Sequence, residues 1–417
     1  MALPTTANVS MEAEPVKSSL FPQPPAVWAV AFASMVTFMG IGLVGPILPT
    51  ISEAMNATPT ETSFLFTSYL VVTAVVMFFT SWLSSRIGTR STMMIGLCVI
   101  AIAAIGCALS TDIGGIIAFR ALWGLGNAMF LSTALASIIS ASGGTAGQAV
   151  VLYEAALGLG LAVGPLVGGL LGDISWMVPF WGTSTLLAIG FVALLVFVRG
   201  SGKPAEKSHV AAPFKALATP SILVLSIVAF FYNSSFFVTL AYVPYPLGMS
   251  AVGIGLVMTG FGIGLALTSV VIAPRLTHRF SPTRVLAATL IVFAATHVAA
   301  SQLTGNTPWL VVCVVLLGFE IGAANTVLTE AVMEASNLPR AVASSAYSGI
   351  RFFGGAIGAP VGTGLAVLGT GVPFLFAAAT AVVGALLLAI FRRILTPADH
   401  PVHETSEFEA AAITAGE

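Results

Sequence analysis

The stretch GLAVGPLVGG, residues 160–169, lies inside a long apolar run and holds four glycines and a proline. In water, glycine in a helix interior costs about 1 kcal/mol relative to alanine, and proline costs about 3 kcal/mol. In a bilayer, small residues four apart let helix backbones approach closely. Gly160, Gly164 and Gly168 share one helix face, and Pro165 removes a backbone hydrogen bond and bends the helix. The spacing predicts a bent transmembrane helix with a narrow ridge, suited either to a sliding contact between two halves or to ordinary close packing.

The composition of the whole chain indicates a membrane protein. Of its 417 residues, 57% are hydrophobic and 7% are charged, and the mean hydropathy is +1.01. Soluble domains carry about 25% charged residues. Runs of about 20 apolar residues match a bilayer core of ~30 Å, and their lack of alternation excludes the strands of an outer-membrane barrel. We therefore expect an all-α integral membrane protein surrounded by the lipid bilayer.

Twelve apolar runs alternate with short polar segments, and they lie at about 27–49, 64–83, 91–110, 113–139, 147–171, 179–198, 221–247, 250–274, 285–304, 309–333, 344–368 and 373–391. Thirteen of the 15 Lys and Arg residues fall in the tails and the even-numbered loops, which predicts that both termini are cytoplasmic in a protein of the cell membrane. The expected organisation is a disordered cytoplasmic tail at 1–26, six-helix bundles at 27–198 and 221–393, a cytoplasmic central loop at 199–220 and a cytoplasmic tail at 394–417.

The two halves of the chain repeat each other at a constant offset of 194 residues. The offset pairs Tyr153 with Tyr347, Gly160 with Gly354, Gly164 with Gly358, and Gly168 with Gly362. Parallel repeats around a central site are typical of transporters, whose halves rock about a bound solute. We expect two pseudo-symmetric six-helix bundles.

The opening stretch also fits a family signature, GxxxGPxxGG, at Gly160, Gly164, Pro165, Gly168 and Gly169. It resembles span 5 of the twelve-span drug:proton antiporters of the major facilitator superfamily, and the twelve runs, the central loop and the duplication extend the resemblance over the chain. The resemblance implies a major facilitator fold, a monomer, and proton-coupled efflux of small hydrophobic or amphipathic compounds by alternating access, as in multidrug transporters that confer antibiotic resistance.

Two other marks of this family are degraded. The family pattern G-x-L-x-D-R-x-G-R-R appears as SWLSSRIGTR, which matches at Leu83, Arg86, Gly88 and Arg90 but has Ser85 in place of the aspartate. The missing carboxylate puts the family's cytoplasmic latch in doubt, and the alternative is a basic turn that fixes topology. In span 4 the pattern R-x-x-Q-G appears as RALWG, residues 120–124, whose arginine takes part in proton coupling in resembling proteins.

Four charged residues lie deep in apolar runs: Arg120, Glu154, Glu320 and Arg351. A charge inside a bilayer costs several kcal/mol, so each is a functional candidate. At about 1.5 Å per residue, Glu320 and Arg351 lie at similar depths on sequential spans, which predicts an ion pair or a water-bridged couple. A carboxylate that changes charge couples protons, so Glu154 and Glu320 are coupling candidates. The alternative is a static pair that locks two helices.

Aromatic, amide and methionine side chains mark a candidate substrate cavity. In resembling transporters spans 1, 4, 7 and 10 line the cavity, and broad apolar faces with few polar groups suit ligands of loose specificity. The candidates on these spans are Met35, Phe38, Met39, Asn127, Phe231, Tyr232, Asn233, Phe236 and Asn325. The alternative is that these side chains face lipid or the helix core.

The function classes left open are few. The main alternative to export is uptake of a small metabolite, such as a sugar or organic acid, by a symporter or facilitator. The sequence has no HExxH or GxSxG motif and no His, Cys and Asp cluster, so we expect no enzyme activity, no metal and no cofactor. It also has no basic domain for nucleic acid, so the expected partners are a small-molecule substrate and protons.

Overall fold

The computed structural model describes residues 23–141, 146–198, 209–335 and 340–395. Every secondary-structure element in these ranges is a helix, and twelve helical segments are long and apolar enough to cross a membrane. This confirms the expected all-α membrane fold. The expected tails at 1–26 and 394–417 lie almost wholly outside the described residues, and so does the first part of the expected central loop.

Seven helices build the N-terminal half: α1 (Pro25–Gly42), α2 (Val44–Ala54), α3 (Pro59–Ile87), α4 (Thr89–Leu109), α5 (Ile113–Ala141), α6 (Ala146–Gly172) and α7 (Val178–Phe197). Local signals fix several of their starts. Thr58 and Glu61 form a reciprocal capping box before α3, because each side chain accepts a hydrogen bond from the other's backbone N–H. Proline occupies the first turn of α1 and α7, where its missing N–H costs no helical bond.

The C-terminal half repeats this pattern, after a short helix in the central segment. Its elements are α8 (Ala212–Ala216), α9 (Pro220–Tyr242), α10 (Pro244–Leu247), α11 (Ala251–Leu267), the π-helical turn η1 (Thr268–Ile272), α12 (Ala273–Thr277), α13 (Pro282–Gln302), α14 (Thr307–Glu334), α15 (Arg340–Gly364), the 3-10 turn η2 (Leu365–Leu368) and α16 (Val372–Ile390). The short α8 packs on α3, where Phe214 stacks on Phe78 at 4.8 Å between ring centroids.

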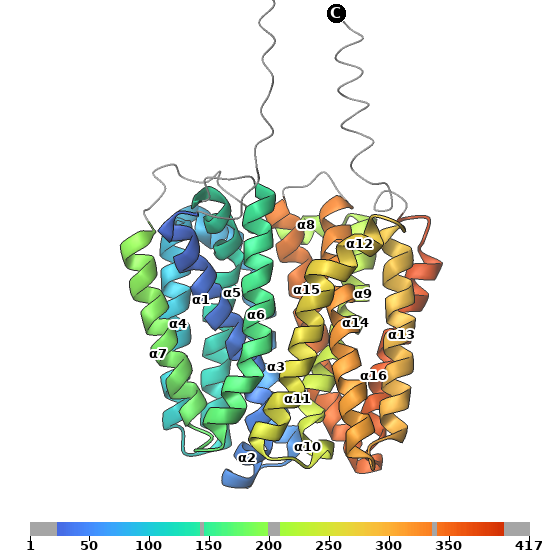
Figure 1. Ribbon diagram of the computed structural model, residues 1–417. Helices are drawn as coiled ribbons and strands as arrows, with labels where there is room; N and C mark the ends of the chain where they lie inside the picture. The colour runs from blue at the N-terminus through green and yellow to red at the C-terminus, as the bar shows by residue number, and fades with distance from the viewer. Residues whose placement is uncertain (1–22, 142–145, 199–208, 336–339, 396–417) are drawn as a thin grey trace, which may run out of the picture.

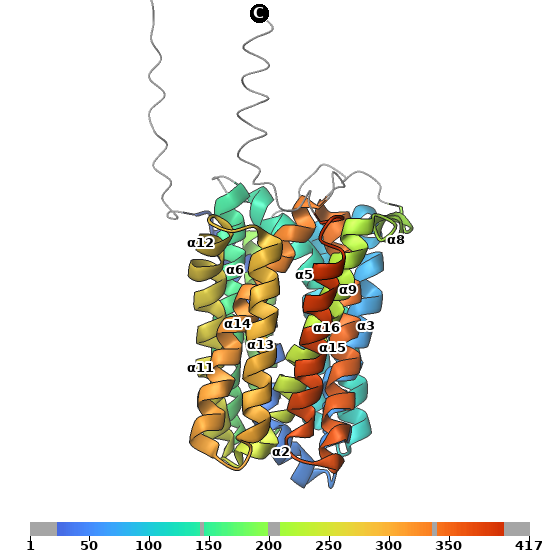
Figure 2. The ribbon, with the colours of Figure 1, turned by 90° about the vertical axis from the view of Figure 1, so that its right-hand side faces the viewer.

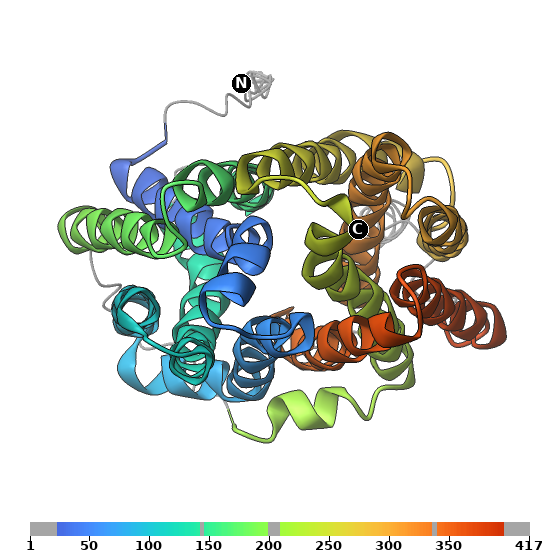
Figure 3. The same cartoon turned by 90° about the horizontal axis from the view of Figure 1, so that it is seen from below.

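The two halves stand side by side, and α1 begins at the same end of the molecule at which α16 ends (Figure 1). The view turned by 90° keeps α11 to α14 together in one layer (Figure 2). Seen from the opposite end, blue-to-green helices form one group and olive-to-red helices the other (Figure 3). Two helix pairs join the halves along their length: α3 with α15, and α6 with α11.

The halves also contact each other at the end opposite the start of α1. There α2 packs on α10 and α11. The hydroxyls of Thr62 in α3 and Tyr245 in α10 are hydrogen-bonded across the boundary. Nearby, the rings of Phe66 and Phe237 meet edge to face at 5.8 Å. This end of the boundary is therefore closed in the conformation described.

Candidate transport site

The glycine ridge of α6 packs within its own half. A Cβ added at Gly164 would lie 2.6 Å from the carbonyl oxygen of Met39, and Cβ atoms at Gly160 and Gly168 would collide with the carbonyls of Met35 and Leu43. All three carbonyls belong to the segment α1–α2. Of the two alternatives for this ridge, close packing is therefore the one that the structure supports for Gly160, Gly164 and Gly168.

The repeat places the same ridge on the other half. Cβ atoms at Gly354 and Gly358 of α15 would collide with or approach the backbone of α9, the latter at 2.5 Å from the carbonyl oxygen of Ser234. The helix pair α15 and α9 is thus the counterpart of α6 and α1. The sequence repeat at an offset of 194 residues corresponds to equivalent helix contacts in space.

A different face of α6 contacts the other half. A Cβ at Gly169 would lie 2.5 Å from the carbonyl oxygen of Ala251 in α11. In the opposite direction, a Cβ at Gly255 would lie 2.7 Å from the carbonyl oxygen of Pro165, and one at Gly262 would lie 2.6 Å from Cα of Ala162. The two backbones therefore touch with few side chains between them. The contact between halves uses Pro165 and Gly169 of the signature, whereas the ridge glycines face α1.

Arg120 lies fully buried among α1, α3 and α5. Its Nη1 and Nε atoms donate to the backbone carbonyls of Gly40 and Leu65, each at 3.3 Å. Its guanidinium also sits 4.7 Å from the ring centroid of Tyr69 and 4.8 Å from that of Trp123. Aromatic faces and carbonyl dipoles stabilise the cation where its hydration is lost. The arginine thereby connects three spans of one half.

Arg351 and Asn233 form a second polar contact, in the C-terminal half. Arg351 Nε donates to Asn233 Oδ1 at 3.4 Å, and Asn233 Nδ2 donates to the backbone carbonyl of Arg351 at 2.9 Å. The guanidinium lies 5.9 Å from the Tyr347 ring centroid and 5.6 Å from that of Phe352. The cavity candidate Asn233 therefore orients a charged side chain.

Of the two predicted arrangements of Glu320 and Arg351, the direct ion pair is not formed among the described residues, and the two side chains have partners on different helices. Glu320 Oε1 accepts a hydrogen bond of 2.6 Å from Thr296 of α13. Its other oxygen, Oε2, has no hydrogen-bond partner within the described part of the chain. The sequence predicted only how deep Glu320 lies in the membrane. The orientation of α14 about its own axis points the Glu320 side chain toward α13 rather than toward α15. The side chain of Glu154, on α6, lies outside the described residues.

The remaining cavity candidates divide into satisfied and unsatisfied side chains. Tyr232 donates to the carbonyl of Ile321 at 3.0 Å and is 1% exposed, so it joins α9 to α14 inside one half. By contrast, neither polar atom of the buried Asn127 side chain has a partner among the described residues, and the same holds for Asn325 Oδ1. Asn127 is fully buried, whereas Asn325 is half-buried and leaves part of its surface accessible.

Most of the apolar candidates pack against neighbouring helices. Phe38 meets Tyr153 of α6 edge to face at 5.9 Å, and Phe236 stacks nearly parallel to Phe261 at 6.2 Å. Met39 is buried, whereas Met35 and Phe231 are half-buried and leave part of their surface accessible.

The degraded loop motif lies at the junction of α3 and α4. Gly88 has a φ of 87°, a backbone conformation that side-chain-bearing residues rarely adopt, and this explains the glycine there. Arg86 lies over the Trp82 ring at 5.9 Å, and Arg90 donates to the carbonyl of Leu195 in α7 at 3.1 Å. Leu83 is half-buried. Arg90 thus ties α4 to α7 within the N-terminal half.

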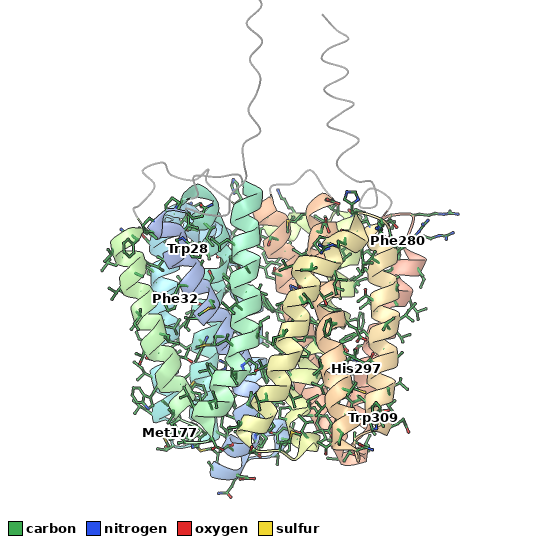
Figure 4. All side chains as sticks on the ribbon, in the orientation of Figure 1. Trp28, Phe32, Met177, Phe280, His297 and Trp309 are labelled. Carbon is green, nitrogen blue, oxygen red and sulfur yellow. The ribbon has the colours of Figure 1, made fainter. Side chains whose placement is uncertain are left out.

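Sequence reasoning missed two partners of the intramembrane charges, Tyr69 and Thr296. Each is a polar residue in an apolar run, which is the only signal that pointed to them. His297, beside Thr296, is different. It lies at mid-depth on α13 (Figure 4), buried, with its ring nitrogens 2.9 Å from the Thr239 hydroxyl and 2.8 Å from the Phe293 carbonyl. These contacts hold the ring inside the C-terminal half and indicate a structural role.

Comparisons with known proteins agree with this architecture. The chain matches the family described as Major Facilitator Superfamily over residues 30–245 and 222–415. It is 45% identical over 341 residues to "Multidrug efflux protein YfmO" of Bacillus subtilis (strain 168), covering 82% of this chain and 86% of that one. Among solved structures it resembles a D-xylose-proton symporter (TM-score 0.72, 14% identity, 87% of this chain and 96% of that one). It also resembles the human organic anion transporter MFSD10 (TM-score 0.69, 15% identity, 87% and 99%). The chain is a multi-pass membrane protein and belongs to the Major Facilitator Superfamily of transporters.

Proposed function

We propose that the chain exports small hydrophobic or amphipathic compounds from the cytoplasm in exchange for protons, by alternating access, in the cell membrane with both termini cytoplasmic. The observation that carries this proposal is the contact between α6 and α11. Gly169 approaches the α11 backbone as closely as glycine allows, and Pro165 approaches it through its carbonyl. These positions belong to the signature typical of exporters.

The contact between α6 and α11 suits movement between the halves because few side chains interlock across it. Two helices that touch backbone to backbone can change their angle without moving rotamers past one another. At one end of the boundary, the Thr62–Tyr245 hydrogen bond and the Phe66–Phe237 ring contact can break and re-form at modest cost. This combination suits halves that rock about a fixed contact.

The direction of transport draws support from the named relative. At 45% identity over most of both chains, a protein called a multidrug efflux protein is a sound guide to substrate type. The likeness to the sugar symporter is 14% in sequence and speaks for the fold alone. The half-buried Met35, Phe231 and Asn325 offer apolar area with few polar groups, and Asn325 Oδ1 has no hydrogen-bond partner among the described residues.

The test is proton flux in proteoliposomes that contain a lumenal pH dye. A pH gradient is imposed, and lipophilic cations and neutral drugs are added one at a time. We expect substrate-triggered proton movement, lost in Glu154→Gln or Glu320→Gln and retained in the control Glu330→Gln on the same helix as Glu320. Substrate movement without proton movement would indicate a facilitator, and movement of substrate and proton in the same direction would indicate a symporter.

A further inference from the structure

A groove of about 530 Å³ lies outside the boundary between the halves, among η1, α12, α13 and α14. Its outer wall includes Phe280, which is 55% exposed, and Val292, which is 54% exposed. Large apolar side chains exposed on the outside of a membrane protein face lipid. The groove is therefore open to the hydrocarbon core of the bilayer.

The groove starts near the end of the molecule at which α1 begins and α16 ends, and it descends into the membrane. Phe280 lies at that end (Figure 4), and Arg284 follows it at the start of α13. From Arg284 to Val292 the groove follows eight residues of α13, or about 12 Å at the rise of an α-helix. Glu320 lines its inner part.

Two buried oxygen atoms along this groove lack partners in the described ranges. One is Oε2 of Glu320, and the other is Oγ1 of Thr268, a side chain only 3% exposed. Thr268 begins the π-helical turn η1. Such turns occur mostly as single bulges inside α-helices and are frequent at functional sites. Thr296 already donates to the other carboxylate oxygen of Glu320. The inner groove therefore offers hydrogen-bond acceptors and negative charge within apolar walls.

We propose that this groove binds protonated lipophilic amines from the bilayer, with the ammonium group on Glu320 and Thr268 and the apolar body along Val285, Ala288 and Phe319. The two unpartnered oxygen atoms can each accept a hydrogen bond from an ammonium N–H, and the negative charge of Glu320 complements the positive charge of the amine. This site would supply a substrate class for the export proposed above, and its role in transport rests on that proposed function. Binding of the amine to the groove does not depend on it.

The charged groups along the groove favour this occupant over an anionic lipid. The Glu320 carboxylate lies deep in the groove, at a level where a bound phospholipid would place its acyl chain rather than its phosphate. The one cation among the lining residues, Arg284, is exposed at the membrane surface end. An amine entering past Arg284 meets repulsion at the surface but not at depth, so approach from within the leaflet is the favoured route.

The experiment measures binding to the purified protein in lipid nanodiscs. The probe is 2-(1-naphthyl)ethylammonium, followed by its fluorescence, and 1-naphthylacetate serves as a ligand with the same ring and the opposite charge. We expect Glu320→Gln to weaken amine binding by about tenfold or more, since one charge-assisted contact is worth at least this factor. Thr268→Val is expected to weaken it less, and Ala288→Trp should block it by filling the groove.

Matched controls separate groove occupancy from general damage. Ala299 is exposed on the same helix as Ala288 but does not line the groove, so Ala299→Trp should leave binding unchanged. Glu330→Gln removes a carboxyl of α14 outside the groove and should do the same. Equal binding in Ala288→Trp and Ala299→Trp would overturn the proposal. So would stronger binding of 1-naphthylacetate that depends on Arg284, which would identify an anionic occupant.

Transport of the same amine distinguishes the two proposals. Binding that follows the expected pattern without any export in vesicles would leave the groove site standing and refute the export function for this ligand. Export that persists in Ala288→Trp, with binding lost, would keep the export function and overturn the role of the groove in it.

Discussion

Gly169→Ala tests whether the contact between α6 and α11 controls the equilibrium between conformations. The new Cβ would lie 2.5 Å from the carbonyl oxygen of Ala251 and 3.1 Å from Cα of Gly255. Ordinary van der Waals contact begins at 3.4 Å, so the two helices must separate by about 0.9 Å. Backbone atoms cannot rotate away as a side chain can, so the strain falls on the boundary between the halves.

The magnitude follows from the usual cost of overpacking, about 1–3 kcal/mol. If about 2 kcal/mol of this is relieved when the halves reorient, the ratio of the two conformations changes by about 30-fold. The conformation described, with α2 and α10 in contact, should lose population to one in which they separate.

The assay is a distance distribution between spin labels at Glu53→Cys in α2 and Met249→Cys next to α10, in a background without the native cysteines. Both sites are exposed, so the labels should not disturb packing. We expect Gly169→Ala to raise the long-distance population and to slow export, with a small change in thermal stability.

Gly164→Ala is the matched control, because its Cβ would lie 2.6 Å from the Met39 carbonyl within one half. This variant should lower thermal stability and leave the distance distribution unchanged. The reasoning is refuted if Gly169→Ala leaves the distances as in the parent protein and loses as much thermal stability as Gly164→Ala.

Three further substitutions test other contacts. Tyr245→Phe removes the hydroxyl contact with Thr62 between the halves, and it should favour separation of α2 and α10 by about 0.6 kcal/mol, measured with the same spin labels. Arg120→Lys replaces a fork that reaches two helices by a single ammonium, and it should destabilise the protein by about 2 kcal/mol in thermal unfolding; an unchanged melting temperature would contradict the bridging role. Tyr232→Phe loses the hydrogen bond to Ile321, so stability should fall by about 0.6 kcal/mol while the KM of export is unchanged, and a raised KM would place this tyrosine in the substrate path.

Much of the fold was predictable because each span carries its own signal. An apolar run of bilayer length must be a helix, since no other structure satisfies its backbone groups in lipid. The repeat at 194 residues predicted that Gly354 and Gly358 would do for α15 what Gly160 and Gly164 do for α6, and the structure places both pairs against the first helix of their own half.

The site was predicted less well. The charge of a residue and its depth in the membrane can be inferred from the local sequence, but its interaction partners depend on how distant helices pack. Arg120 was identified as a buried charge, but its position between Tyr69 and Trp123 depends on how α3 and α5 pack. Asn233 was identified as a cavity candidate, yet it binds Arg351.

The sequence by itself determined the class of protein, the number of spans, the duplication and the glycine-based packing of span 5. These properties follow from composition and residue spacing, because the requirements of the bilayer apply to each helix separately. Only the tertiary structure decided which face of each helix meets which neighbour. Glu320 and Arg351 share a depth but point to different helices, and Gly168 and Gly169 are adjacent but face different halves. Consecutive residues differ by 100° around a helix, so their partners depend on how twelve helices pack together.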